Sequence, residues 1–315
     1  MTAIIILNYN NYNDTINCIK SVEQFNSASI KYIIVDNGST NRKCIDSIHK
    51  FLEKSFNENY KCIHENEEIK KLPYATFLIC KKNYGYAKGN NNGLNLAYKD
   101  PEIKNILILN NDILFVEDII PQLITDLYTL KDAAIVSPVL YKKDMSEIDH
   151  TCARKILTLK QRFLLYAFLF KNIFGIVSKI QSSNYLLYNK NLSLIDPILE
   201  IELPSGSCML FNKLFFKSIE SFDPNTFLYC EEDILYEKIK LKGKKNYLDT
   251  NLKCIHLGAS TTSSQTTSKF IFKCSIESNH YFLTQYTNAN TLYLAFMKLF
   301  YKIMYLKIFI KNLMK

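Results

Sequence analysis

Two clusters of polar side chains in this sequence have the residue types that bind and activate charged ligands. The first, residues 110–112 (Asn-Asn-Asp), interrupts the apolar run "ILILNNDILF", and the second is the acidic triplet at 231–233 (Glu-Glu-Asp). Polar groups at the end of a buried strand cost free energy unless they are hydrogen-bonded or face a ligand. A turn is the simpler interpretation of the first cluster, because Asn and Asp are common turn residues. Acids in the first turn of a helix complement its dipole, which is the simpler interpretation of the second.

Each cluster also has a chemical interpretation. Asp112 is a hard oxygen ligand beside two amides, which suits Mg²⁺ or Mn²⁺ held together with substrate phosphates. Consecutive helical residues point about 100° apart, so the three acids cannot all serve one purpose, and one of them is a candidate general base. His256 ends an apolar strand, where a neutral imidazole would complete a metal site, and a hydrogen-bonded structural histidine is the alternative. The other four histidines share no spacing and are predicted to be structural.

The first half of the chain alternates strand-like and helix-like patterns that would position these residues. Four short apolar runs are the predicted strands: residues 3–7, 32–36, 75–80 and 105–109. Helical periodicity lies between them, from about residue 14, over 44–52 and over 89–98. Strands that alternate with helices predict a mostly parallel sheet covered by helices, which is an α/β fold.

Several of these predicted strands end on polar residues. Asn8 and Asp36 follow the first two strands, residues 110–112 follow the fourth, and the polar loop 82–93 comes after the third. In open α/β sheets, ligands bind outside the carboxyl ends of the strands. The repeated pattern therefore favours a ligand cleft over a set of unrelated turns.

The pattern is less regular in the second half. Residues 154–180 are apolar and basic and are predicted to be helical. Residues 198–211 indicate two short strands around Pro204, and residues 222–243 indicate a loop that leads into a helix ending at Gly243. Residues 253–260 are predicted to form a last strand and turn.

Composition excludes several classes of protein. The 315 residues are 48% hydrophobic, which excludes wholesale disorder and suffices for one large α/β domain with an appendage, or for two ordinary domains. The nine cysteines form no C-x-x-C pair, which indicates reduced thiols in a cytoplasmic setting. The sequence predicts neither a signal peptide nor a spanning helix. The glycine motifs of dinucleotide-binding proteins, P-loop proteins and serine hydrolases do not occur.

Seven segments occur in an order that resembles family 2 glycosyltransferases. They are "IIILNYNNYNDTINCIKSV", "IIVDNGST", "NYGYAKGNNNGLNLA", "ILILNNDI", "PSGSCMLF", "FLYCEEDILYEKIKLKG" and "IHLGASTT". The resemblance is to the rhamnosyltransferase-like bacterial branch, and it covers about residues 3 to 262 with a weaker stretch at 142–197. It implies a GT-A fold over residues 1–262: a Rossmann-like, mostly parallel sheet flanked by helices, with a variable helical insert at 142–197. Residues 263–315 would be a helical, basic tail.

The resemblance also implies roles for individual residues. The nucleotide-sugar would be bound at the strand ends and in the loop after the third strand, by Asn8, Tyr9, Asn10, Asp36, Asn83, Gly85, Asn111 and Asp112. Asp112 and His256 match residues of the family's metal and diphosphate site, which implies a divalent cofactor, Mg²⁺ or Mn²⁺. Asn110 departs from the acidic first position of the family's D-x-D motif. Glu232 matches the usual catalytic base, and Glu231 and Asp233 are the alternatives.

The activity implied by the resemblance is transfer of a sugar from a nucleotide-sugar to an acceptor hydroxyl, with inversion. The acceptor would be a saccharide or lipid-linked saccharide in the synthesis of a cell-surface polysaccharide or glycan. A non-catalytic module with the same fold that binds a nucleotide-sugar or glycan is the alternative. A nucleotidyltransferase would normally carry a basic, glycine-rich loop after its first strand, and "NYNNYND" is neither basic nor rich in glycine.

The positive charge of the chain is concentrated in its tail. Residues 265–315 hold seven lysines and one acid, a net +6 of the total +9, whereas a nucleic-acid-binding protein would be basic throughout. On a helical projection Lys298 and Lys302 lie together and Lys307 lies on roughly the opposite side, which favours two short helices that change face near Met304. The tail is predicted either to pack on the catalytic domain or to attach the protein to the anionic inner face of the cell membrane.

Overall fold

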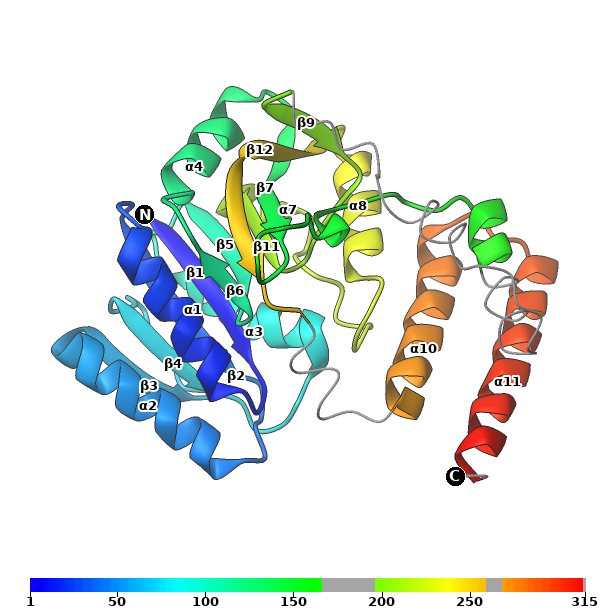
Figure 1. Ribbon diagram of the computed structural model, residues 1–315, viewed down its shortest axis with the longest axis horizontal. Coiled ribbons are helices and arrows are strands. Elements are labelled where there is room, and N and C mark those ends of the chain that lie inside the picture. The colour runs from blue at the N-terminus through cyan, green and yellow to red at the C-terminus, as the bar shows by residue number, and fades with distance from the viewer. Residues whose placement is uncertain (166–195, 259–267, 314–315) are drawn as a thin grey trace.

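A computed structural model of the chain describes residues 1–165, 196–258 and 268–313. A central twisted sheet with helices on both faces forms most of the molecule, and two long helices near the C-terminus lie beside it (Figure 1). The elements of the first half follow the predicted order of alternating strands and helices. The expected α/β architecture is thus confirmed.

The first half of the sheet is entirely parallel. Its strands are β1 (Thr2–Asn8), β2 (Ile30–Asp36), β3 (Tyr60–His64), β4 (Ala75–Ile79) and β5 (Asn105–Asn110), in the order β3-β4-β2-β1-β5. Asn8 lies opposite Asp36 in the register, and Leu7 lies opposite Asn110, so the polar strand ends meet at one edge. The sequence analysis missed β3, an edge strand in which only Ile63 is buried.

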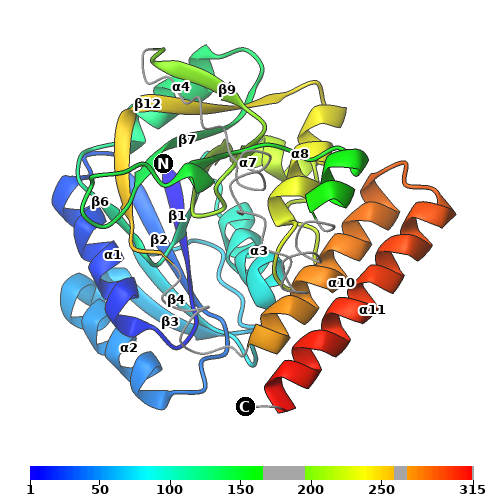
Figure 2. The ribbon, with the colours of Figure 1, turned by 45° about the vertical axis from the view of Figure 1, so that its right-hand side comes forward.

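Helices cover both faces of this half. The helices α1 (Tyr12–Phe25), α2 (Arg42–Phe56) and α4 (Ile120–Thr129) pack on the face that receives Ile4, Ile6 and Ile34. The opposite face receives the alternate residues Ala3, Ile5 and Ile33, and is covered by α3 (Gly85–Lys99), α7 (Lys213–Ser218) and α8 (Glu231–Leu241). The two sides of the sheet are seen best in Figure 2. Burial on both faces explains why these strands are continuous apolar runs.

The second half of the sheet is mixed. Its strands are β6 (Ile113–Phe115), β7 (Ala133–Tyr141), β9 (Ile198–Ile201), β11 (Cys208–Asn212) and β12 (Lys245–His256). The strand β11 joins β5 to β7 and is antiparallel to both, and β12 continues beyond β7 in parallel. Two short 3₁₀ helices, η1 (Asn57–Asn59) and η2 (His150–Cys152), lie in the connections between these elements.

That second sheet corrects two predictions. It pairs β8 (Ala153–Arg154) with β10 (Leu203–Pro204), so Pro204 lies in a strand and residues 198–211 contain three strands instead of two. A proline is tolerated there because the sheet has only two strands, and both are edges. Of the helix expected over 154–180, Arg154 is in β8 and residues 159–165 are helical, while residues 166–180 lie outside the described part.

The C-terminal region is a helical hairpin of α10 (Ser268–Tyr286) and α11 (Thr291–Leu313), which lie side by side in both ribbon views (Figures 1 and 2). The predicted break near Met304 is wrong, because α11 is one continuous helix without Gly or Pro. Leu283 of α10 packs on Met297 and Tyr301 of α11. Within the described residues, no helix is long and apolar enough to cross a membrane.

Candidate active site

The polar ends of the first two strands form one hydrogen-bonded network. The buried Asn8 donates from Nδ2 to Asp36 Oδ1 at 2.8 Å and accepts at Oδ1 from Thr15 Oγ1 at 2.9 Å. Asp36 also accepts from the hydroxyl of Ser39 at 2.5 Å and from its backbone N–H at 3.0 Å. Burial raises the pKa of Asp36, against the opposing effect of the hydrogen bonds from Ser39 and Asn8. Asn111 extends the network to β5 by donating to Thr15 Oγ1 at 3.0 Å.

The other residues expected on the nucleotide side lie along the same edge. Tyr9 is half-buried, and Asn10 has a left-handed backbone with a φ of 55° and donates from its N–H to Ser39 Oγ at 2.8 Å. Asn83 Oδ1 accepts from the N–H of Gly85 at 2.9 Å. Gly85 has a φ of +80°, and a Cβ there would lie 2.1 Å from the Phe227 carbonyl oxygen. A glycine is therefore required where α3 begins.

Asp112 and His256 lie together, as the resemblance implied. His256 Nε2 is 3.5 Å from Asp112 Oδ2, and its other nitrogen, Nδ1, is 2.7 Å from Asp149 Oδ2. The antiparallel pairing of β12 with β6, in which His256 faces Ile113, brings the histidine to the polar end of β5. Asp149 was not predicted, and it orients the ring in the way that outer-shell carboxylates orient metal-binding histidines.

The two carboxylates control the charge of the imidazole. Burial lowers the pKa of His256, but the hydrogen bonds to Asp112 and Asp149 outweigh it and raise the value to about 9. Burial raises the pKa of Asp149, yet the contacts with His256 and Thr151 bring it down to about 2. Without a cation, the site therefore holds an imidazolium between two carboxylates at neutral pH.

The donor set fits a divalent cation that takes its other ligands from phosphate. Asp112 Oδ1 is buried and has no hydrogen-bond partner in the described part of the chain. An orphaned carboxylate oxygen beside an imidazole nitrogen is a suitable pair of ligands for such an ion. Between residues 1 and 313, leaving out 166–195 and 259–267, no group of three or more His, Cys, Asp or Glu could hold a metal by itself. The remaining ligands would have to come from substrate or water.

The acidic triplet opens helix α8. The residue before it, Cys230, has a left-handed backbone with a φ of 65° and donates no side-chain cap, so the acids occupy the first turn. As their helical spacing predicted, the three side chains have three different environments. Glu232 Oε1 accepts from the Gly206 N–H at 3.1 Å, and Oε2 forms an ion pair with Arg154 at 3.1 Å. Asp233 forms a buried ion pair with Arg162 at 2.6 Å.

Glu231 differs from its neighbours. It is buried, and its Oε1 has no hydrogen-bond partner in the described residues. Burial and the negative charge of Glu232 raise the pKa of Glu231 to about 8. Of two adjacent carboxyl groups in one site, this one keeps its proton at neutral pH.

A short segment joins the two clusters. Gly206 donates to Glu232, and the next residue, Ser207, accepts from Asn110 at both its carbonyl oxygen (2.8 Å) and its hydroxyl (3.1 Å). Tyr86 of α3 donates to the Gly206 carbonyl oxygen at 2.6 Å. A Cβ on Gly206 would lie 2.8 Å from both Glu232 Oε1 and the Tyr86 hydroxyl, so a larger residue would displace these side chains from the segment.

These residues border a single pocket of about 430 Å³. Its lining includes Asn110 and His256 from the ends of β5 and β12, Glu231 and Glu232 from the first turn of α8, and Arg154 from β8. The volume is in the range of small-molecule sites. The pocket thus places a possible cation site and an acidic cluster around one space.

Sequence reasoning missed several of the residues that shape the pocket. Asp149 and Arg154 lie in the stretch of weak resemblance, where no motif distinguishes them, and Arg162 lies in a basic run that resembles a solvated helix. Gly206 stands in the quoted segment "PSGSCMLF", but no role was assigned to it. Its position between two polar residues after a proline was the available signal.

The fold resembles solved GT-A glycosyltransferases. A crystal structure of GalNAc-T7 with UDP, GalNAc and Mn²⁺ superposes with a TM-score of 0.57 at 10% identity, covering 90% of this chain and 47% of that one. The mannosyltransferase PcManGT from Pyrobaculum calidifontis, in complex with GDP-Man and Mn²⁺, superposes with a TM-score of 0.55 at 10% identity. The match covers 94% of this chain and 68% of that one. The chain spans about half the length of the GalNAc-T7 structure. At this identity the likeness establishes the GT-A fold.

The family follows from the sequence itself. The profile of glycosyl transferase family 2 matches residues 3–191, which is more than half of the chain. The chain therefore belongs to glycosyl transferase family 2. No curated protein sequence matches it.

Proposed function

We propose that this protein is an inverting glycosyltransferase that moves a sugar from a nucleoside-diphosphate sugar to an acceptor hydroxyl. The observation that carries the proposal is the 430 Å³ pocket, which His256 and Glu232 both border. Single displacement at an anomeric carbon needs charge stabilisation at the leaving group and a base near the acceptor. The two clusters around the pocket supply one group for each task.

The strand-end network would bind the nucleoside. Asn8, Asp36 and Asn111 are held in place by one another and by Thr15, so this edge is pre-organised before a ligand binds. Tyr9, Asn10, Asn83 and Gly85 border the same edge and are proposed as further contacts. The two solved neighbours contain UDP and GDP-Man, which supports a nucleotide-sugar as the donor class.

Asp112 and His256 would hold a divalent cation, Mg²⁺ or Mn²⁺. When bound, such an ion neutralises the charge that develops on the diphosphate leaving group. Asp112 contributes its unpartnered Oδ1, and Asp149 holds the His256 ring with Nε2 directed toward the cation site. Both neighbouring structures contain Mn²⁺, which supports this assignment.

Glu232 would remove the proton of the acceptor hydroxyl. Arg154 compensates its charge, and the Gly206 N–H fixes one carboxylate oxygen, which leaves the side chain oriented at the pocket. Glu231, with its raised pKa of about 8, is protonated at neutral pH and is the less suitable base. Asp233 is engaged by Arg162. Among the three acids, Glu232 therefore best meets the requirements for a base.

The acceptor class is proposed to be a saccharide or a lipid-linked saccharide of the cell surface, and the branch to be rhamnosyltransferase-like. All nine cysteines are free thiols, which supports a reducing, cytoplasmic location. The sugar, the nucleotide and the linkage are the properties to be measured next.

The experiment is a panel of nucleotide-sugars incubated with the protein and Mn²⁺, with released nucleoside diphosphate detected by mass spectrometry. We expect one donor class to be hydrolysed slowly without acceptor, and the activity to be lost on chelation and restored by added metal. Binding of a donor without any turnover, with or without candidate acceptors, would instead favour the non-catalytic module.

A further inference from the structure

Helix α11 exposes a row of apolar side chains on one face. The residues are spaced four and three apart, which places them on one side of a helix, and we call them the apolar stripe: Leu292, Phe296, Leu299, Ile303 and Leu306. Their exposed fractions range from 37% for Ile303 to 80% for Leu292. Scattered exposed apolar residues are normal, but a contiguous row of them marks an interaction site.

Most of the stripe lies away from the face that packs on the protein, and Phe296 is the member that touches it, with its ring 5.2 Å from that of Phe163. Met297, Tyr301 and Met304 lie on another side of α11 and are almost fully buried, at 1%, 3% and 3% exposed. Tyr301 and Met297 pack on Leu283 of α10. The hairpin is therefore stabilised mainly by one face of α11, while the side chains of the stripe stay 37–80% exposed among the described residues.

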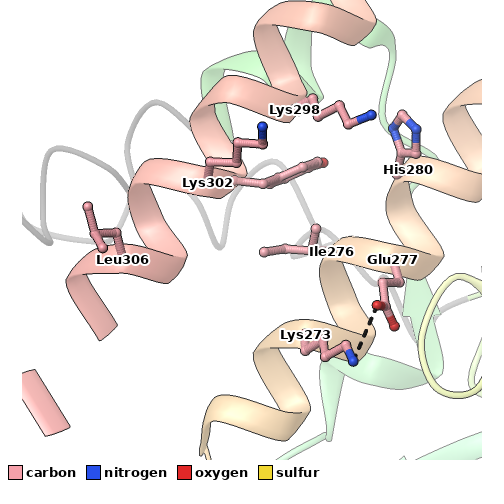
Figure 3. Close-up of a pocket in the computed structure, with 8 residues that line it drawn as sticks. Lys273, Ile276, Glu277, His280, Lys298, Lys302 and Leu306 are labelled. Carbon is pink, nitrogen blue, oxygen red and sulfur yellow. Dashed lines mark ion pairs between the residues drawn. The ribbon is translucent and has the colours of Figure 1, made fainter. Parts of the chain in front are cut away.

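A groove between the two helices adjoins the stripe. It has a volume of about 720 Å³ and is shown in Figure 3, with Ile276, Tyr301 and Leu306 among its lining residues. Leu306 belongs to both the groove and the stripe. The apolar surface is thus continuous from the groove onto the outer face of α11.

Basic side chains line the same surface. Lys298 and Lys302 are exposed, border the groove, and have no ion pair with an acid of the described chain (Figure 3). Lys273 lies across from them and pairs with Glu277 at 3.7 Å. His280 also lines the groove, with Nδ1 buried and unpartnered among the described residues. Apolar walls with cationic rims match an amphiphile with an anionic headgroup.

We propose that the stripe and the groove bind the surface of an anionic lipid bilayer, with α11 lying in the plane of the interface. The stripe runs over about 21 Å of helix from Leu292 to Leu306, at 1.5 Å per residue. Its side chains enter the region between headgroups and acyl chains, and Lys298 and Lys302 pair with lipid phosphates. Since α11 is not a spanning helix, this is attachment to one leaflet.

A second copy of the chain fits this surface less well. Spacing of four and three also suits a coiled coil, whose flanking positions normally carry opposite charges. The segment 291–315 has five lysines and no acid, so a symmetric pair of α11 helices would bring like charges together. An anionic bilayer instead provides the missing charge.

The attachment surface is firmly connected to the acidic cluster. Arg162 donates to Asn279 of α10 at 2.6 Å and pairs with Asp233 of α8, and Asn279 in turn donates to the Tyr301 hydroxyl of α11. Docking of the hairpin would therefore fix how the pocket is oriented relative to the membrane. The binding itself is independent of the proposed sugar transfer, and its test needs neither donor nor acceptor.

The first experiment uses the absence of tryptophan from the sequence. Phe296→Trp introduces a single indole into the stripe, and Leu241→Trp places one at an exposed position of α8 as the control. On vesicles of phosphatidylcholine with phosphatidylglycerol, we expect the emission of the Trp at 296 to shift to the blue and to be quenched by brominated lipid. The control emission should not change. Equal behaviour of the two reporters would overturn the proposal.

The second experiment compares co-sedimentation of the full chain with the same vesicles for matched pairs of surface variants. Lys298→Glu with Lys302→Glu should weaken partitioning by at least about 25-fold, because each lysine contributes roughly a factor of five. The control, Lys50→Glu with Lys54→Glu, makes the same change at the same spacing on α2.

A second matched pair of variants tests the contribution of the apolar stripe to vesicle binding. Leu292→Ser with Leu299→Ser should reduce partitioning at least about tenfold, whereas Leu214→Ser with Leu241→Ser, equally exposed elsewhere, should leave it unchanged. Failure of the parent chain to bind anionic vesicles would overturn the proposal. So would a parent dimer, seen by light scattering, that the stripe variant converts to monomer without any vesicle binding.

Discussion

Buried polar groups are fully hydrogen-bonded on one side of the candidate site and partly unpaired on the other. At the ends of β1 and β2, Asn8 and Asp36 hydrogen-bond to each other and to neighbouring hydroxyls. Around the pocket, charged groups are held in ion pairs, and the buried Asp112 Oδ1 and Glu231 Oε1 have no partner in the described chain. The first side has its hydrogen bonds satisfied within the protein, whereas the second leaves carboxylate oxygens for a ligand to pair with.

This difference separates two uses of a polar residue. A satisfied network maintains a shape and contributes to stability, whereas an orphaned carboxylate oxygen costs stability and persists where a ligand provides its partner. Substitution in the strand-end network should therefore cost stability as well as nucleoside binding, whereas substitution of an orphaned carboxylate should change binding and turnover with little cost in stability.

The largest effect on stability is expected at the buried ion pair of Arg162 and Asp233 in the wall of the pocket. Arg162→Met leaves the carboxylate of Asp233 buried without its cation, which should lower the free energy of unfolding by about 3–5 kcal/mol. Arg42→Met is the control, because Arg42 pairs with Asp46 in a fully exposed position. Chemical denaturation of both variants provides the measurement, and a small loss in Arg162→Met would contradict the assignment.

The next effect concerns the cation site. Asp149→Asn keeps the shape of the side chain that holds His256 but removes its charge, and should weaken Mn²⁺ binding in the presence of a nucleoside diphosphate about 10- to 100-fold. Calorimetric titration measures the affinity. The matched control is Asp144→Asn in the same segment, where the carboxylate bonds to Ser146. Equal affinities in the two variants would mean that Asp149 does not position the histidine.

Alanine substitutions compare the two sides directly. Asn8→Ala removes bonds to Asp36 and Thr15 and should destabilise the fold by about 1–3 kcal/mol. Asp112→Ala removes the unpartnered Oδ1 and the 3.5 Å contact of Oδ2 with His256, which keeps its shorter ion pair with Asp149, so the cost should stay below about 1 kcal/mol, while metal-dependent donor binding is lost. Thermal unfolding of the two variants measures the contrast. A larger loss of stability in Asp112→Ala than in Asn8→Ala would contradict this contrast between the two sides.

The smallest effect is a change in the pH dependence of stability. With a pKa raised to about 8, Glu231 keeps a proton in the folded state that the unfolded chain loses near its ordinary value, so stability falls as pH rises between about 5 and 8. Glu231→Gln removes this contribution. Relative to the parent, the variant should gain stability at pH 8 compared with pH 5, measured by urea denaturation.

The strands of the parallel half were predictable because burial on both faces requires continuous apolar runs such as residues 3–7 and 105–109. The edge strand β3 was not, since it buries only one side chain. The lysine positions of α11 predict a break that the helix does not have. Packing on α10 through Met297 and Tyr301 determines the helix instead.

The site was predictable where its residues stand at strand ends or in the first turn of a helix. Asp112, His256 and Glu232 have such positions, and two of them meet in the structure as expected. Asp149 reaches His256 across 107 residues, and Arg162 reaches Asp233 across 71, and neither pairing leaves a local pattern in the sequence. Partners that are set by tertiary packing alone could not be inferred from one chain.

The central claim is that the pocket joins a donor site to a base, and Glu232→Gln tests it most directly. The amide keeps the size of the side chain and can still accept from the Gly206 N–H, but it cannot take a proton. Transfer measured under single-turnover conditions should fall by about 100-fold or more, while the Kd for the donor, measured in parallel, changes less than about threefold. Transfer at the parental rate, or a loss of donor binding as large as the loss of rate, would contradict the account.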